Sequence, residues 1–204
     1  MSRAERRRAE ILDAAYRVFA DRGFAEATIA DIAKELSIGH GTFYRYFENK
    51  QDIFDHVVDL VVARISAALA DERPDASDGL EEYRAQVRRI AGNLLVLLDE
   101  DPRAAKLLFV EAWGVSDALD ARLREMWRLF GQVTGAYLEN GRTRGFLRAD
   151  LDVEITALAI NAMIFEGGRQ VVLSERDAGD GAAARARWID AVTAMMFDGV
   201  RSAG

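Results

Sequence analysis

Two short segments near the start of the chain, each with apolar residues at helical spacing, most constrain its fold. In residues 28–36 the apolar positions follow i, i+3, i+4 and i+7, and Thr28 and Asp31 have the spacing of an N-terminal capping box. In residues 40–47 two phenylalanines four residues apart share one helical face. About four residues join the segments. Two short helices joined in this way form a helix-turn-helix, whose second helix enters the major groove of DNA.

The outer face of the second segment carries hydroxyls, a glycine and a cation, which suits contact with an acidic polymer backbone. The candidate DNA-binding residues are Thr28, His40, Gly41, Thr42, Tyr44, Arg45, Tyr46 and Lys50. We expect the two tyrosines and Thr42 to bind phosphates, and Thr28 and Lys50 to add contacts through a helix N-terminus and a cation. An ordinary solvated lysine is the alternative for Lys50.

Two residues of this set are candidates for reading bases. Arg45 has the donor geometry that prefers guanine, and His40 lies at the start of the same helix. A merely exposed surface role is the alternative for His40. Gly41 would permit close approach of the backbone to DNA.

A longer amphipathic helix precedes these segments and is expected to end at Gly23, with Phe24 packing behind it. The motifs in order are Phe19-Ala-Asp-Arg-Gly-Phe24, Thr28-Ile-Ala-Asp-Ile-Ala33, Gly41-Thr-Phe-Tyr-Arg-Tyr-Phe47 and Asn49-Lys-Gln-Asp-Ile-Phe54. With them, residues 11–54 resemble the N-terminal domain of the tetracycline-repressor (TetR) family of bacterial regulators. Many members carry serine where this chain has Gly39, which brings no side-chain oxygen for a phosphate.

The resemblance implies an all-α chain with two domains. We expect a helix-turn-helix DNA-binding domain at residues 1–47 and a helical effector-binding and dimerisation domain at residues 48–204. Only two prolines interrupt the 204 residues, which also favours an all-helical chain. Asn49 should cap a helix that runs from about residue 50 towards Leu69, and periodic runs predict five more helices at roughly 80–99, 102–113, 116–140, 152–174 and 182–201.

The net charge of −7 is unevenly distributed and does not exclude nucleic acid. Arg3, Arg6, Arg7 and Arg8 against Glu5 form a basic segment that could track DNA or stay a disordered tail. The chain has no cysteine, no signal-peptide pattern and no apolar run long enough to span a bilayer. We therefore expect a cytoplasmic protein without membrane contact.

The last two predicted helices carry apolar stripes that would suit a homodimer interface. The candidate interface residues are Ile155, Ala159, Ala162, Trp188, Val192, Met195 and Met196. A monomer core explains the same stripes. The resemblance favours a four-helix interface built from both subunits, and two heads would also supply the specificity that one small head lacks.

An aromatic-rich body with a few polar residues inside apolar runs suggests a binding site for a hydrophobic or amphiphilic effector. The candidate pocket residues are Phe109, Trp113, Trp127, Phe130, Asn161, Phe165, Glu166 and Arg169. Plain core packing is the alternative for the aromatic residues. Glu166 and Arg169 are three residues apart and could simply pair with each other.

These observations favour a ligand-responsive transcriptional repressor that binds operator DNA as a homodimer. A constitutive DNA-binding regulator without an effector is the alternative. An enzyme is not expected, because the chain has two histidines, no cysteine, no phosphate-binding loop and no clustered metal-ligand spacing. A carboxylate-only hydrolase is the remaining enzymatic alternative. We expect no cofactor and no metal.

Overall fold

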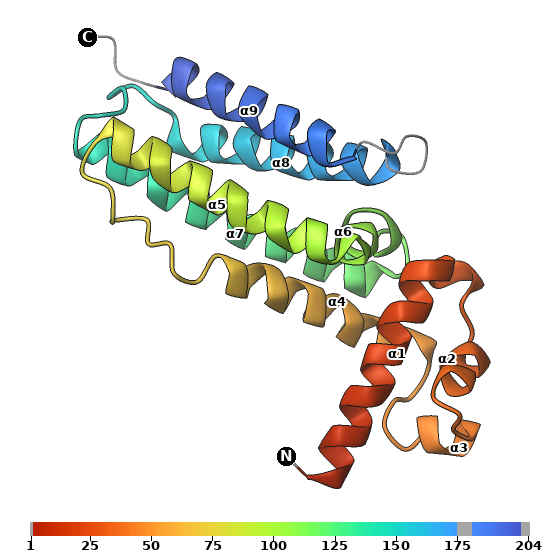
Figure 1. Cartoon of the computed structure of the whole chain (residues 1–204). Helices are drawn as coiled ribbons and strands as arrows, with labels where there is room; N and C mark the ends of the chain where they lie inside the picture. The colour runs from red at the N-terminus through yellow and green to blue at the C-terminus, as the bar shows by residue number, and fades with distance from the viewer. Residues whose placement is uncertain (1, 175–180, 201–204) are drawn as a thin grey trace. The chain divides into compact units, whose positions relative to one another are not determined.

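The computed structural model describes residues 2–174 and 181–200, and the regular structure within them is helical (Figure 1). The fold is all-α. The elements in chain order are α1 (Arg3–Glu26), α2 (Ile29–Glu35), α3 (His40–Phe43), α4 (Lys50–Ala68), α5 (Leu80–Glu100), α6 (Pro102–Lys106), the π-helix η1 (Leu107–Glu111), α7 (Asp117–Thr143), α8 (Val153–Ser174) and α9 (Gly181–Val200). The helices expected at 80–99, 116–140, 152–174 and 182–201 are present with ends that differ by a few residues, although residue 201 lies outside the described residues. The segment expected as one helix at 102–113 is divided between two elements.

The chain divides into two compact units. The head unit is Met1–Arg64 with Asp101–Asp120, and the body unit is Ile65–Glu100 with Ala121–Gly204. The head unit therefore holds α6, η1 and most of α4 besides the first three helices. This structural division differs from the expected boundary at residue 47, and the functional division at that residue stays a prediction.

The head unit has an aromatic core where α1 and α4 meet. Ile11 and Phe19 on α1 are fully buried, and the Phe19 ring lies edge-on to Phe54 of α4 with 4.9 Å between centroids. Phe24 completes the group at 4.7 Å from Phe54. In the chain between Phe19 and Phe24, Gly23 adopts φ +81° and interrupts the helix, as the sequence predicted. This backbone conformation suits glycine because it has no Cβ.

Local capping chemistry sets the start of α2. The Thr28 hydroxyl accepts from the Asp31 N–H at 3.2 Å, and the Asp31 carboxylate accepts from the Thr28 N–H at 3.0 Å. The predicted capping box is therefore confirmed. Half of this arrangement recurs at α4, where the Asp52 N–H donates to the Asn49 side chain at 2.9 Å and the Asp52 carboxylate accepts from the Glu48 N–H at 2.8 Å.

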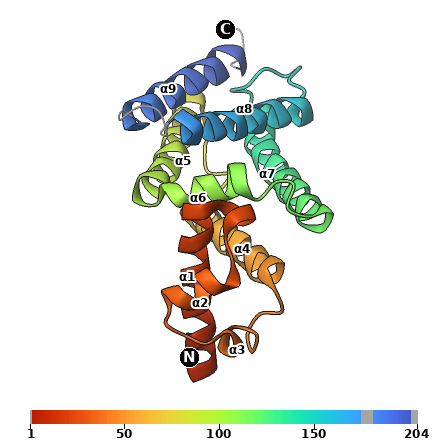
Figure 2. The same cartoon turned by 90° about the vertical axis from the view of Figure 1, so that its right-hand side faces the viewer.

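The recognition segment is shorter as a helix than the sequence suggested. Regular helix covers only His40–Phe43, and Tyr44 to Tyr46 continue as a turn (Figure 2). Phe43 and Phe47 are both buried, with ring centroids 5.9 Å apart. The two predicted aromatic anchors are therefore in place although the helix between them is not complete.

The N-terminal basic segment is helical and not a disordered tail. Helix α1 begins at Arg3, and Ser2 and Glu5 form a complete capping box at its start. The capping box makes the arginines part of a regular helix, so the disordered-tail alternative is wrong and contact of these arginines with DNA stays a prediction. Arg8 lies over the Phe47 ring, with 4.8 Å from its guanidinium carbon to the centroid.

The helix predicted at residues 102–113 changes from an α-helix to a π-helix, and it belongs to the head unit instead of the body. Residues 102–113 were expected as a single helix, but α6 passes into η1 at Leu107. Both elements pack against α1, as Figure 2 shows. Single-turn π-helices often occur at functional positions.

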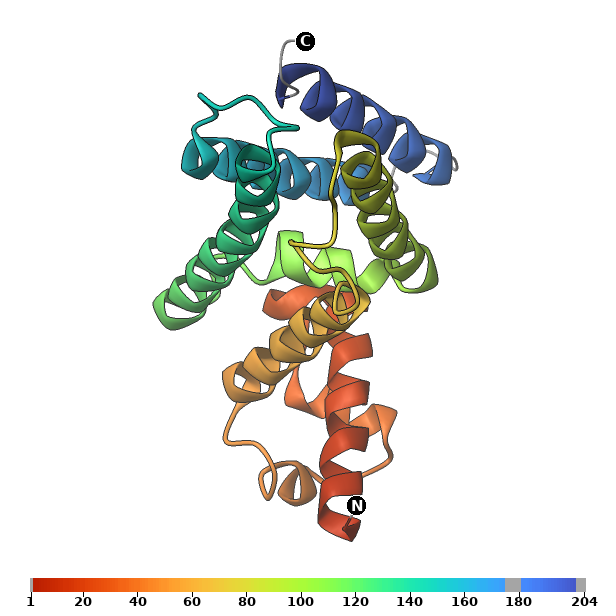
Figure 3. The same ribbon diagram turned by 90° about the vertical axis from the view of Figure 1, so that its left-hand side faces the viewer.

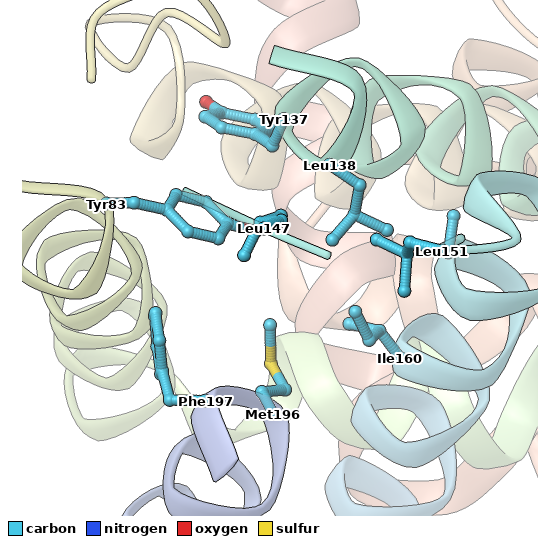
Figure 4. Packing of buried hydrophobic residues seen from close by; sticks show 9 residues of the cluster. Tyr83, Tyr137, Leu138, Leu147, Leu151, Ile160, Met196 and Phe197 are labelled. Carbon is cyan, nitrogen blue, oxygen red and sulfur yellow. The ribbon is translucent and has the colours of Figure 1, made fainter. Parts of the chain in front are cut away.

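The body unit is a helical bundle in which α9 packs against α5 and α8 (Figure 3). Its buried core joins these helices with α7 and the segment before α8 (Figure 4). The members shown include Tyr83, Tyr137, Leu138, Leu147, Leu151, Ile160, Met196 and Phe197. Helix α7 lies against α8 at Gly131 and Gly135, where an added Cβ would be in ordinary contact with Asn161 at 3.8 Å and with Val153 at 3.7 Å.

Candidate nucleic-acid interface and ligand-binding residues

The recognition segment presents a polar outer face above its buried anchors. His40, Gly41 and Arg45 are exposed, Thr42 and Tyr46 are half-buried, and Tyr44 is 56% exposed. The exposed Tyr44 ring packs edge-on against Phe43, with 5.4 Å between centroids.

Arg45 is the cation of this face that keeps its donors free. It makes no hydrogen bond or ion pair with any residue in the ranges 2–174 and 181–200. A free guanidinium can therefore meet a base edge or a phosphate without losing an internal partner.

The two glycines at the start of this segment are not required by packing. A Cβ built on Gly39 or Gly41 would meet nothing within 4 Å, and neither residue has a positive φ. An external surface that approaches the backbone would explain Gly41, as predicted. Gly39 is the N-cap of α3 and provides no side-chain cap, as its lack of an oxygen requires.

Lys50 has a different environment from the expected phosphate contact. Its ammonium donates to the carbonyl oxygens of Phe24, Ala25 and Ala27 at 2.7, 3.3 and 3.0 Å. It also lies 4.4 Å from the centroid of the Phe24 ring. An ammonium has three N–H donors, and here all three are used inside the protein. Lys50 therefore binds the end of α1, and the phosphate contact expected for it stays a prediction.

Thr28 is exposed, but its hydroxyl is engaged by Asp31. The hydroxyl donates to the carboxylate at 2.6 Å besides accepting from the backbone. This hydrogen bond, together with that from the Thr28 backbone and the nearby Arg22, lowers the pKa of Asp31. The predicted phosphate contact of Thr28 would therefore use a hydroxyl that already has a strong acceptor.

The end of α1 is held by a second group of contacts that the sequence did not reveal. The Phe24 N–H donates to the Glu111 carboxylate at 3.2 Å, and the Lys106 ammonium donates to the Ala20 carbonyl. Lys106 and Glu111 lie 3.8 Å apart, and both side chains are 19% exposed. The hydrogen bonds from Phe24 to Glu111 and from Lys106 to Ala20 join residues more than eighty positions apart, so no local pattern could have predicted them.

Asp101 fixes the other side of α6 to α1. Its carboxylate accepts from the Tyr16 hydroxyl at 2.5 Å and from Arg64 at 3.2 Å. Burial, followed by the hydrogen bond to Asp101, raises the pKa of Tyr16. The phenol therefore stays protonated and keeps donating at any ordinary pH.

The candidate dimer residues separate into an exposed group and a group that packs at least partly within the chain. Ile155 and Met195 are 58% and 54% exposed, and Leu158 on the same face of α8 is 64% exposed. Ala159 and Ala162 are also exposed. An exposed row of large apolar side chains of this kind is typical of an interaction surface.

The other candidates contact residues of their own chain, as the monomer-core alternative expected, although only Met196 is buried and Trp188 and Val192 are half-buried. Met196 is buried in the body core, and Val192 packs against that core. Trp188 lies directly over Gly167, where an added Cβ would be only 2.0 Å from the indole ring. These three residues belong to the packing of α9 within one chain.

The candidate ligand residues are likewise only partly brought together. In the body unit the Trp127 ring lies 4.9 Å from Phe165 and 5.7 Å from Phe130. One turn along α8, Asn161 accepts from the Thr134 hydroxyl at 3.1 Å. Thr134 was missed, although a hydroxyl inside the apolar run of α7 is a usable signal. Phe109 and Trp113 belong to the head unit.

Glu166 and Arg169 form an exposed ion pair instead of lining a pocket. The guanidinium donates to both carboxylate oxygens at 2.8 and 2.6 Å. The hydrogen bonds from Arg169 and then Gln170 lower the pKa of Glu166 to about 2. The pairing alternative is confirmed, and neither residue offers an unpaired charge to a ligand.

Comparison with known proteins gives the family. The model for bacterial regulatory proteins of the tetR family matches residues 11–57. The probable HTH-type transcriptional regulator ArpR of Pseudomonas putida is 31% identical over 164 residues, which cover 79% of this chain and 78% of ArpR. The HTH-type transcriptional regulator TtgR of the same species is 30% identical over the same shares of the two chains.

Solved structures agree on the fold. A TetR transcriptional regulator from Chloroflexus aurantiacus superposes with a TM-score of 0.80 over the full length of both chains at 17% identity. The regulator FadR from Bacillus subtilis in complex with stearoyl-CoA gives 0.69 at 21% identity, covering 91% of this chain and 97% of FadR. None of the helices in residues 2–174 and 181–200 is long and apolar enough to cross a membrane. The chain belongs to the TetR family of helix-turn-helix DNA-binding transcriptional regulators.

Proposed function

We propose that this regulator is a homodimeric repressor that a hydrophobic or amphiphilic small molecule releases from its operator. The observation that carries the proposal is the recognition segment, in which two buried phenylalanines hold a polar face whose residues His40, Tyr44 and Arg45 are exposed. On this face Arg45 and His40 read base edges, and Tyr44, Tyr46 and Thr42 bind phosphates.

The dimer part of the proposal rests on the exposed apolar row of α8 and α9. Ile155, Leu158 and Met195 would each lose their contact with water in a symmetric pairing of two copies. Burial of apolar area is the main driving force of such association. Two recognition segments about 34–36 Å apart would then enter successive major grooves on one side of the duplex.

The effector part rests on the half-buried aromatic group Trp127, Phe130 and Phe165 in the body unit. FadR from Bacillus subtilis, which shares the fold, is known in complex with stearoyl-CoA. A ligand that binds the DNA-incompetent state more tightly shifts the population away from the operator, and coupling of about 1–3 kcal/mol is typical. The relatives are transcriptional regulators, so nothing favours the hydrolase alternative.

The test uses the full-length protein and duplexes selected from a random library. Light scattering should give a dimer, and fluorescence anisotropy should give tighter binding to the selected duplex than to random DNA. A small amphiphile library is then screened for release. A monomer without sequence preference would refute the DNA-reading proposal. A sequence-specific dimer that no compound releases would favour a constitutive regulator.

A further inference from the structure

One carboxylate joins three helices of the head unit. Asp101, at the start of α6, accepts from the Tyr16 hydroxyl of α1 at 2.5 Å and from the Arg64 guanidinium of α4 at 3.2 Å. The guanidinium also lies over the Tyr16 ring, with 4.9 Å from its central carbon to the centroid. Tyr16 is only 3% exposed, so water competes little for its hydroxyl. These three side chains are called the Asp101 lock below.

The lock lies at two of the places where the chain passes between its units. The chain leaves the head unit after Arg64 and returns to it at Asp101, and the lock binds both points to α1. Tyr16 lies in the middle of α1, whose first turns carry Arg8 over the Phe47 anchor of the recognition segment. Figure 2 shows α3 and α6 towards opposite ends of α1. A change at Asp101 can therefore reach the recognition segment through a continuous helix.

Asp101 also has a second role within its reach. It is the N-cap residue of α6, a position from which aspartate ordinarily accepts a hydrogen bond from the first helical turn. Among the residues that the structure describes, its side chain makes no such bond, because the carboxylate is turned to Tyr16 and Arg64. A carboxylate that left the lock would find new N–H donors and a favourable helix dipole at its own helix. The two arrangements can therefore lie close in free energy, as a switch requires.

We propose that the Asp101 lock is the conformational switch of the DNA-binding head. In the locked form Asp101 is held by Tyr16 and Arg64, and α1 and α4 present the recognition segment in one arrangement. In the released form Asp101 caps α6 and this arrangement is lost. The locked form binds the operator more tightly, because a head held in one arrangement has less freedom to lose on binding. The inference rests on the proposed function and adds its regulation, with Tyr16 and Arg64 as positioning residues that do not touch DNA.

The first test is operator affinity of full-length variants, measured by fluorescence anisotropy with a duplex selected from a random library. Tyr16→Phe removes the hydroxyl and keeps the ring under Arg64, and it should weaken binding roughly fivefold or more. Tyr137→Phe is the matched control, because it removes a hydroxyl that donates to the Glu72 carbonyl at 2.9 Å in the body unit. Its operator affinity should equal that of the wild type.

A second variant covers the case in which Tyr16→Phe does not fold. Asp101→Asn gives the same test, because a neutral amide binds Tyr16 and Arg64 more weakly but can still cap α6. It should also lose roughly fivefold or more in operator affinity. Wild-type affinity in a folded Tyr16→Phe or Asp101→Asn protein would overturn the proposal.

Hydrogen exchange separates a switch from a purely structural contact. If the lock favours DNA binding, the duplex must favour the lock to the same degree. The selected duplex should therefore slow amide exchange in α6 of the wild type more than it slows exchange in the body core around Ile160. In the free protein, Tyr16→Phe should speed exchange in α6 and leave the body core unchanged. Equal slowing of α6 and the body core by the duplex would reduce the lock to a structural contact and overturn the proposal.

The proposed function fails in a different way. If the lock variants behave as expected and no compound of the amphiphile library releases DNA, the switch stands and the effector response is wrong. If a compound releases the wild type while Tyr16→Phe keeps wild-type affinity and exchange, the effector response stands and the lock is wrong.

Discussion

Replacing Gly23 with alanine should destabilise the head unit, because the backbone there has φ +81° and ψ 161°. This region is essentially restricted to glycine and costs other residues about 1–3 kcal/mol. The new Cβ would also lie 2.7 Å from a Glu111 carboxylate oxygen. Moving that carboxylate away would leave the Phe24 N–H without its acceptor, at a further cost of about 1–3 kcal/mol. We expect a total loss of roughly 2–6 kcal/mol.

The assay is urea unfolding followed by circular dichroism, with calorimetry to resolve the two units if they unfold separately. Gly41→Ala is the matched control, because it lies in the same unit, has no positive φ and has open space for a methyl group. Its stability should stay equal or rise by up to about 1 kcal/mol, as for glycine in a helix. The same substitution should thus act in opposite directions at the two positions.

A double-mutant cycle separates the two parts of the cost. In a Glu111→Ala background the clash is absent, so Gly23→Ala should cost only the backbone part of about 1–3 kcal/mol. An equal cost in both backgrounds would mean that Glu111 yields freely and does not hold the end of α1. A loss within a few tenths of a kcal/mol in the wild-type background would refute the whole reasoning.

Three further substitutions test the site. Lys50→Met should lower the stability of the head unit by about 1–3 kcal/mol, because three carbonyls lose their hydrogen-bond donor. It should leave the salt dependence of DNA binding unchanged. A slope of log affinity against log salt concentration that falls by about one would instead identify Lys50 as a phosphate contact. Arg45→Ala should cost about 1–3 kcal/mol on a selected duplex and much less on random DNA in anisotropy titrations, whereas equal losses would assign it to the backbone. Leu158→Glu should shift the dimer to monomer in sedimentation without unfolding it, and an unchanged dimer would remove α8 from the interface.

Features that depend on neighbouring residues were predictable from the sequence. In the capping box at Thr28 and the cap at Asn49, each side chain binds a backbone N–H three residues away, so the spacing of residue types alone identifies both caps. The π-helix η1 (Leu107–Glu111) was not predictable, because the apolar pattern of its sequence is also that of an α-helix. The intramolecular contacts of Lys50 were not predictable for a related reason: the carbonyls that it binds lie 23 to 26 residues away.

Apolar periodicity identifies a buried face but not the surface that buries it. On α9, Met195 and Met196 are neighbours in one apolar run, yet one is 54% exposed and the other lies in the core of its own chain. Trp188 would suit a dimer seam by composition, but the missing side chain of Gly167 lets it pack within the chain. The positions of α5 and α8 against α9 decide which of these side chains are buried, and those positions are tertiary properties.

Polar residues inside apolar runs carry more information when their possible partners are counted. Glu166 and Arg169 are three residues apart on one helix, so each had a partner of opposite charge within reach, and the two pair on the surface. Asn161 had no such partner within its own helix. Thr134 on α7 satisfies one of its polar atoms and leaves the other buried without a hydrogen bond. Spacing along one helix therefore predicts how a charged pair is used, whereas the partner of a lone amide depends on which neighbouring helix packs against it.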